Sequence, residues 1–200
     1  MPRFLHPVRC RYLILGLSLL WLRLAVAELP AGAELVFELS PAQSHVTFTL
    51  SSLLHTIHGT IQVKRGYLRL KPSDGAVSGE CVVDARSGDS GSRSRDSKMH
   101  HNILASVRYP EMVFVPSQMR GTVALGGTSV VDIDGTFTIH GVSHRLTITA
   151  TVNITGDHFT FATHFMIPYV QWGMEDPSTF ILTVDKQVEI TFEAVGHIVR

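Results

Sequence analysis

Apolar and polar residues alternate with a period of two through most of this chain, and this alternation limits the folds open to it. Successive side chains of a β-strand point to opposite faces, so such runs indicate strands with one apolar face. The residues that share a face in each run are Val46, Phe48 and Leu50; Ile61 and Val63; Leu68 and Leu70; Val77, Cys81 and Val83; Val131, Ile133, Phe137 and Ile139; Leu146, Ile148, Val152 and Ile154; Phe159, Phe161, Phe165 and Ile167; and Val188, Ile190 and Phe192.

Short clusters of turn-forming residues separate these runs. They lie at residues 72–75, 126–127, 156–157 and 185–186, and Arg65 with Gly66 is expected to form a further turn before Leu68. Many strands divided by turns every 8 to 12 residues or so indicate an all-β sandwich or barrel, and not alternating strands and helices.

Two stretches interrupt the alternation. Residues 87–97 are rich in Ser, Gly, Arg and Asp and are expected to form an exposed loop. Asp96 or Ser97 is then expected to cap a short helix that runs to about Ala105, with Met99 and Ile103 on its inner face. Residues 168–178 are expected to form a long loop or a bent pair of strands. The sequence therefore predicts one short helix in a mid-chain crossing between strands.

Residues 1–27 have the composition of a secretory signal peptide. Arg3, Arg9 and Arg11 precede an apolar run at 12–22, and Ala-Val-Ala at 25–27 provides a cleavage site of small residues. The apolar run has about 11 residues, whereas a membrane span needs about 20. We expect a secreted or periplasmic protein in which residues 28–200 form one domain, with no membrane span after cleavage. A leader retained as an N-terminal anchor is the alternative.

Removal of this leader would leave a mildly acidic chain. The leader contains four of the 17 basic residues of the chain and none of its 17 acidic residues. The remaining 13 basic and 17 acidic residues give a net charge of −4. Such a charge argues against nucleic acid as a partner. Only Cys81 remains beyond the leader, so the fold has no internal disulfide, but 173 residues are enough for a substantial hydrophobic core.

Several short motifs follow one another along the chain. They are Ser-His-Val-Thr-Phe at 44–48, His58 with Gly59, Gly66, Arg95 with Asp96, Leu104, Tyr-Pro-Glu at 109–111 followed by Phe114, and the glycine-bounded strand and turn at 135–143. In their order and spacing these motifs resemble those of the YceI-like family of polyisoprenoid-binding, lipocalin-like β-barrels, and the resemblance extends from about Val36 to about Val195. The resemblance implies an extended antiparallel barrel of about eight strands whose apolar lumen holds a long chain, without catalysis or cofactor.

The lumen of such a barrel would be lined by the aromatic side chains of the alternating runs and by apolar residues of the irregular segments. An eight-stranded barrel is either filled by its own side chains or just wide enough for one small ligand. The same residues could therefore pack a closed core. The candidates for ligand contact are Phe48, Met99, Leu104, Phe114, Phe137, Phe159, Phe161, Phe165 and Trp172.

Arg95 and Asp96 admit two interpretations. The first is structural, because a carboxylate near a helix N-terminus stabilises the junction between loop and helix. The second is a polar contact with the head group of a ligand. We favour the structural interpretation.

The sequence offers little support for catalysis or for a metal site. The histidine pairs His55/His58 and His100/His101 would diverge on a strand or a helix, so no metal site is predicted. There is no Gly-x-Ser-x-Gly motif, and Cys81 lies within an alternating run typical of buried thiols.

We therefore expect a non-enzymatic protein that carries or sequesters a long-chain isoprenoid or fatty amphiphile, for example a polyisoprenoid or a quinone-like molecule. The alternatives are an extracellular interaction module with a self-filled core, and an isoprenoid-modifying or metal-dependent enzyme. Whether the chain acts as a homodimer is left open.

Overall fold

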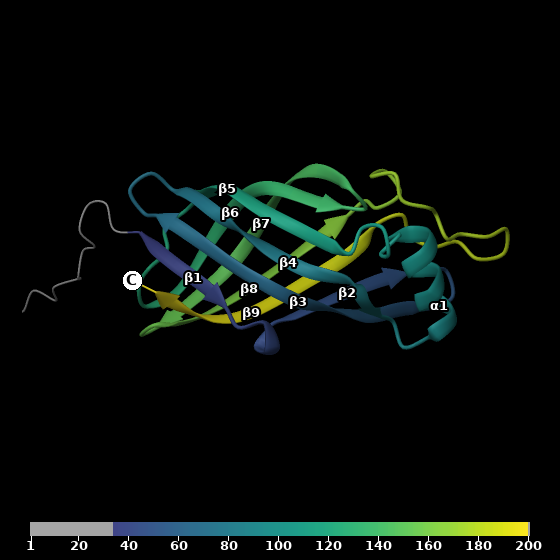
Figure 1. Cartoon of the computed structure of the whole chain (residues 1–200), viewed down its shortest axis with the longest axis horizontal. Helices are drawn as coiled ribbons and strands as arrows, with labels where there is room; N and C mark the ends of the chain where they lie inside the picture. The colour runs from purple at the N-terminus through teal and green to yellow at the C-terminus, as the bar shows by residue number, and fades with distance from the viewer. Residues whose placement is uncertain (1–33, 200) are drawn as a thin grey trace, which may run out of the picture.

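The computed structural model describes residues 34–199, and within them nine antiparallel strands form one sheet that closes on itself (Figure 1). The short connections between successive strands favour this antiparallel arrangement. The strands are β1 (Leu35–Leu39), β2 (His45–Ser51), β3 (Thr56–Lys71), β4 (Ala76–Asp89), β5 (Glu111–Arg120), β6 (Gly127–Ile139), β7 (Val142–Thr155), β8 (His158–Ile167) and β9 (Val188–Val199).

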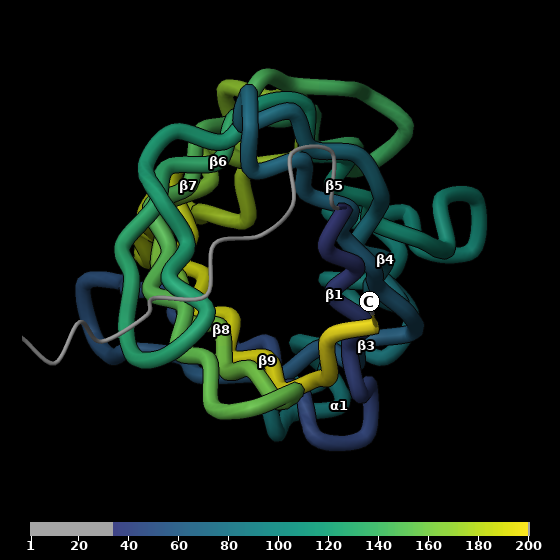
Figure 2. Tube along the Cα trace, turned by 90° about the vertical axis from the view of Figure 1, so that its left-hand side faces the viewer, coloured from purple at the N-terminus to yellow at the C-terminus, as the bar shows by residue number. Residues whose placement is uncertain are grey.

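The nine strands occupy eight positions around the barrel. β1 and β2 each pair with both β3 and β9, so they are two halves of one wall position, separated by the short helical turn η1 (Pro41–Gln43). The pairing of β3 with β4 completes the ring, which is seen end-on in Figure 2. The predicted all-β antiparallel barrel of about eight strands is confirmed.

The alternation of the sequence matches the inward and outward faces of the wall. On β2, Val46 and Phe48 are buried whereas Thr47 is exposed, and β6 repeats the pattern with buried Val131 and Ile133 beside exposed Val130. Turns lie at 72–75 and 156–157, as predicted. The inward side chains form two packed clusters that share Leu39, Phe114, Leu146 and Phe165 as neighbours, so the core is continuous along the barrel.

The predicted turn at Arg65 and Gly66 is wrong. β3 continues through both residues, and a shift of register against β4 between Val63 and Arg65 absorbs the irregularity. Such a bulge bends a strand without ending its pairing. Gly66 is needed there for a different reason, because a Cβ at this position would overlap the side chain of Leu39 on β1.

The predicted exposed loop at 87–97 is also largely wrong. β4 extends to Asp89, and helix α1 (Arg93–Lys98) begins soon after. Within this stretch the hydroxyl of Ser87 binds backbone groups: Ser87 Oγ accepts from Gln62 N at 2.8 Å and donates to Asp84 O at 2.6 Å. A serine-rich composition is thus compatible with a strand when the hydroxyls find partners in the neighbouring chain.

The predicted helix exists but begins earlier than expected. Ser92, and not Asp96 or Ser97, occupies the N-cap position, and α1 continues into the π-helical segment η2 (Met99–Ile103). Residues 168–187 join β8 to β9 as a long loop, which confirms the loop expected at 168–178 and lengthens it. Both segments lie at the same end of the barrel (Figure 1).

The leader expected at 1–27 lies outside the described residues. Among residues 34–199, no helix is both long enough and apolar enough to cross a membrane.

Candidate functional site: the barrel lumen

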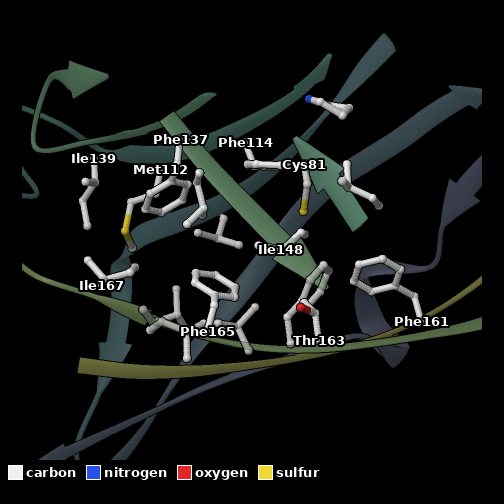
Figure 3. Close-up of a pocket in the computed structure, with 18 of the residues that line it drawn as sticks. Cys81, Met112, Phe114, Phe137, Ile139, Ile148, Phe161, Thr163, Phe165 and Ile167 are labelled. Carbon is white, nitrogen blue, oxygen red and sulfur yellow. The ribbon is translucent and has the colours of Figure 1, made fainter. Parts of the chain in front are cut away.

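A cavity of about 250 Å³ lies inside the barrel, and side chains of all nine strands contribute to its wall. The wall consists almost entirely of aliphatic, aromatic and sulfur-containing side chains that point toward one another across the lumen (Figure 3). An apolar cavity of roughly 150 Å³ in another protein already binds benzene, so this volume is sufficient for an apolar ligand.

The structure brings eight of the nine predicted ligand-contact residues together on this wall. They are Phe48, Met99, Leu104, Phe114, Phe137, Phe159, Phe161 and Phe165. The close-up in Figure 3 shows Phe114 and Phe137 on one side of the lumen and Phe161 and Phe165 on the other. Whether these side chains touch a ligand stays a prediction.

Cross-strand pairing sets the position of the aromatic rings. Phe114 on β5 and Phe137 on β6 are direct partners, and a Cβ on nearby Gly135 would come 2.5 Å from the Phe114 ring. On the opposite wall, Phe159 packs edge-on against Phe37 with ring centroids 5.2 Å apart. Such edge-to-face pairs stabilise by about 0.5–1.5 kcal/mol beyond the area they bury.

The irregular segments cover one end of the cavity. η2 contributes Met99 and Ile103, followed by Leu104, and the loop 168–187 contributes Tyr169 and Met174. The hydroxyl of Tyr169 donates to the carbonyl oxygen of Asp185 at 2.7 Å, which ties the start of the loop to its end. Burial, with the nearby charges of Asp176 and Asp185, raises the pKa of Tyr169 to about 12, so this hydroxyl stays a donor at neutral pH.

Trp172 does not belong to the cavity wall of the described residues. Its ring stacks on the imidazole of His144, with centroids 4.1 Å apart and planes 3° from parallel, and its centroid lies 6.2 Å from that of Phe137, the cross-strand partner of His144. The indole thus packs on the first residues of β7, on the face that carries Phe137, and whether Trp172 touches a ligand stays a prediction.

Arg95 and Asp96 bind the chain between β4 and α1. Both converge on buried Ser90: Arg95 Nε donates to Ser90 Oγ at 2.8 Å and its NH2 group to Ser90 O at 2.7 Å, while Asp96 Oδ1 accepts from Ser90 N at 2.9 Å and from Ser90 Oγ at 2.5 Å. Partial burial opposes ionisation of Asp96, but these bonds and the Arg95 charge outweigh it and lower its pKa. The pair therefore has a structural role in this geometry.

Few polar residues line the cavity, and one of them, Glu80, has its carboxylate engaged by Arg65, whose Nε donates to Glu80 Oε1 at 2.9 Å. Thr163 Oγ1 donates to the carbonyl oxygen of Thr149 at 2.7 Å. Burial, with a smaller effect of Glu80, raises the pKa of Cys81 to about 12, so its thiol is not a nucleophile at neutral pH. In the described part of the chain, no three His, Cys, Asp or Glu residues are grouped to hold a metal ion.

Sequence reasoning missed several wall residues. Ile139, Ile190 and Phe192 belong to alternating runs that were recognised, so their face already indicated an inward position. Phe37 and Leu39 lie on β1, a strand too short to stand out as a run. Met174 comes from the loop 168–187 and had no periodic signal, because only the tertiary fold brings that loop over the cavity.

Comparison with known proteins gives consistent results. The YceI-like domain model matches residues 37–196. A UPF0312 protein of Pseudomonas syringae pv. tomato is 27% identical over 192 residues, which cover 89% of this chain and 96% of that protein.

Two solved structures share the fold. BcnA of Burkholderia cenocepacia is 23% identical, with a TM-score of 0.61 over 78% of this chain and 98% of that one. A polyisoprenoid-binding domain from Saccharophagus degradans, implicated in plant cell wall breakdown, is 15% identical, with a TM-score of 0.64 over 81% and 97%. With an antiparallel barrel, an apolar lumen and a family model that matches most of its length, this chain belongs to the YceI-like family.

Proposed function

We propose that the protein is a non-enzymatic carrier or sequestering protein for a long-chain amphiphilic lipid, a polyisoprenoid or quinone-like molecule, held in the barrel lumen. The observation that carries the proposal is the continuous apolar wall of the cavity, formed by all nine strands. The polyisoprenoid-binding domain of Saccharophagus degradans, which has the same fold, supports this ligand class.

The chemistry of the wall suits a hydrocarbon chain. Burial of each methylene group contributes about 0.8 kcal/mol, so about 15 groups contribute roughly 12 kcal/mol. After an association cost of at least about 4 kcal/mol, the remainder corresponds to a micromolar dissociation constant. Because the lumen has few hydrogen-bonding groups, it would select for chain length and shape, and the polar head group would remain near an end of the barrel.

We further propose that the protein works outside the cytoplasm. The support is the signal-peptide composition of residues 1–27. Sequencing the N-terminus of the exported protein tests this: cleavage after Ala27 makes Glu28 the first residue, whereas an intact Met1 would contradict cleavage.

Native mass spectrometry of the protein recovered from its exporting host, followed by organic extraction, tests ligand binding. A discrete adduct of several hundred daltons that extracts as an isoprenoid or fatty compound is the expected result. A measured mass that equals that of the protein alone, and that does not change after incubation with long-chain lipids, would favour an interaction module with a self-filled core.

A pair of variants places the ligand in the lumen. Phe161→Asp puts a carboxylate into the cavity wall and should remove the adduct, because an unpaired charge next to a hydrocarbon chain is costly. Val130→Asp makes the same charge change on the exposed outer face of β6 and should keep the adduct. Circular dichroism distinguishes loss of ligand from loss of the barrel.

A further inference from the structure

Two neighbouring turns at the α1 end of the barrel expose large apolar side chains. Leu53 and Leu54 lie in the turn between β2 and β3, and Phe180 and Ile181 lie at the tip of a turn within the loop 168–187. Each of the four is at least 72% exposed. Turn tips usually carry Gly, Asn, Asp, Ser or Pro, and clustered exposed apolar side chains mark interaction sites. We refer to these four residues as the apolar rim.

Backbone hydrogen bonds hold the two turns side by side. Leu53 N donates to Thr183 O at 3.1 Å, and Asp185 N donates to Ser51 O at 2.9 Å. Ser52 and Val184 form a β-bridge between these bonds. A bond from Thr179 N to Leu182 O at 2.8 Å closes the second turn, with Phe180 and Ile181 at its tip. The four side chains are therefore presented together on an ordered support.

The apolar rim belongs to the segment that covers the cavity. The loop that carries Phe180 and Ile181 also contributes Tyr169 and Met174 to the cavity wall. The hydroxyl of Tyr169 binds the carbonyl oxygen of Asp185, four residues beyond Ile181. A binding partner on the apolar rim would thus lie next to the covered end of the lumen. Figure 1 shows α1 and the loop 168–187 at this end of the barrel.

Exposed cations accompany the rim at this end. Arg93 and Lys98 lie on α1, and Arg108 follows exposed Val107 in the next turn. None of the three forms an ion pair within residues 34–199, whereas Lys186 on the loop pairs with Asp176. Glu175 on the same loop accepts a hydrogen bond from Asn102. The exposed carboxylates of Asp89, Glu175 and Asp185 at this end likewise form no ion pair within residues 34–199, so the three cations do not outnumber the acids, but they are free to contact anionic phosphates.

We propose that the apolar rim docks the protein onto an anionic lipid bilayer. Leu53, Leu54, Phe180 and Ile181 enter the headgroup region, and the three cations contact lipid phosphates, the combination by which peripheral proteins bind interfaces. The proposal rests on the proposed function, because docking brings the covered end of the lumen to the surface from which a lipid ligand enters.

Vesicle flotation tests the proposal with the protein recovered from its exporting host. The vesicles contain phosphatidylcholine, with or without phosphatidylglycerol. We expect binding to the phosphatidylglycerol vesicles, and a fall of about tenfold or more for the double variant Leu54→Asp/Phe180→Asp, because two apolar side chains no longer insert. Arg93→Gln/Lys98→Gln should lower binding to these vesicles by about thirtyfold, since each cation near an anionic surface contributes about one kcal/mol.

The control is Val130→Asp, which alters an exposed apolar side chain on the outer wall of β6 and should bind as the unaltered protein does. Absence of vesicle binding, or equal binding by the Leu54/Phe180 variant, would overturn the proposal. So would a dimer in analytical ultracentrifugation that only this variant loses, because the rim would then be a contact between copies. The variant changes no cavity-wall residue, so its lipid adduct in native mass spectrometry reports on the proposed function separately.

Discussion

The ring of Phe48 on β2 packs directly against the backbone of Gly59, its cross-strand partner on β3. A Cβ at Gly59 would overlap this ring and would also approach the carbonyl oxygen of Asp89 to 2.6 Å. Glycine at this position therefore lets the end of β4 and an aromatic side chain of the cavity wall approach β3 together. The His-Gly motif at 58–59 has a steric explanation in this contact.

The substitution Gly59→Ala should destabilise the barrel by about 1–3 kcal/mol, because an overpacked core forces side chains and backbone to shift. Urea unfolding followed by tryptophan fluorescence measures the change. Gly126→Ala is the control, since nothing lies within 4 Å of a Cβ built there. Equal stability of the two variants would show that Phe48 moves aside without cost.

Asp96→Asn should lower the free energy of unfolding at neutral pH by about 1 kcal/mol, because the charged acceptor of two hydrogen bonds from Ser90 becomes neutral. The folded-state pKa of Asp96 lies below its ordinary value. Its contribution is therefore complete above the unfolded-state pKa, near 4, and is lost as the pH falls through the lower folded-state pKa.

The stability difference between the unaltered protein and Asp96→Asn should thus shrink when urea unfolding is repeated below about pH 4. Asp185→Asn is the control, because its exposed carboxylate makes no hydrogen bond within residues 34–199. A difference that stays constant down to pH 2 or so would contradict the role assigned to the Asp96 charge.

Cys81 should react with thiol reagents far more slowly than an exposed cysteine at pH 8. Burial raises its pKa to about 12, so the thiolate is scarce and also shielded inside the barrel. Labelling followed by intact mass spectrometry gives the rate, and Val130→Cys provides an exposed thiol on β6 for comparison. Rapid labelling of Cys81 in the folded protein would mean that the lumen opens readily to solvent.

Trp172→Ala should loosen the loop 168–187, since the indole stacks on His144 and packs near Phe137. Loss of an aromatic pair costs about 0.5–1.5 kcal/mol in addition to the buried area. Limited proteolysis should then cut within this loop sooner than in the unaltered protein. Trp172→Phe keeps an aromatic ring and serves as the control; equal cleavage of all three proteins would show that other contacts hold the loop.

The barrel class could be predicted from sequence because period-two alternation depends only on local geometry and burial. Phe159, Phe161 and Phe165 share one face of β8 whatever the neighbouring strands are, and all three reach the cavity wall. The errors arose where partners far along the chain decide the conformation. The local sequence at Arg65 and Gly66 predicts a turn, but pairing of these two residues with β4 keeps β3 continuous through them.

The sequence by itself determined the strand class, the inward faces, the mid-chain helix and, through the order of its motifs, the family, because these follow from side-chain periodicity and local chemistry. Only the tertiary structure decided that β1 and β2 share one wall position, that Trp172 packs on His144, and that Arg95 and Asp96 meet at Ser90. It also brought the turns of Leu53 and Phe180 side by side. These contacts join segments that are distant in sequence. Local sequence patterns do not specify them, because they depend on which distant segments pair when the sheet closes.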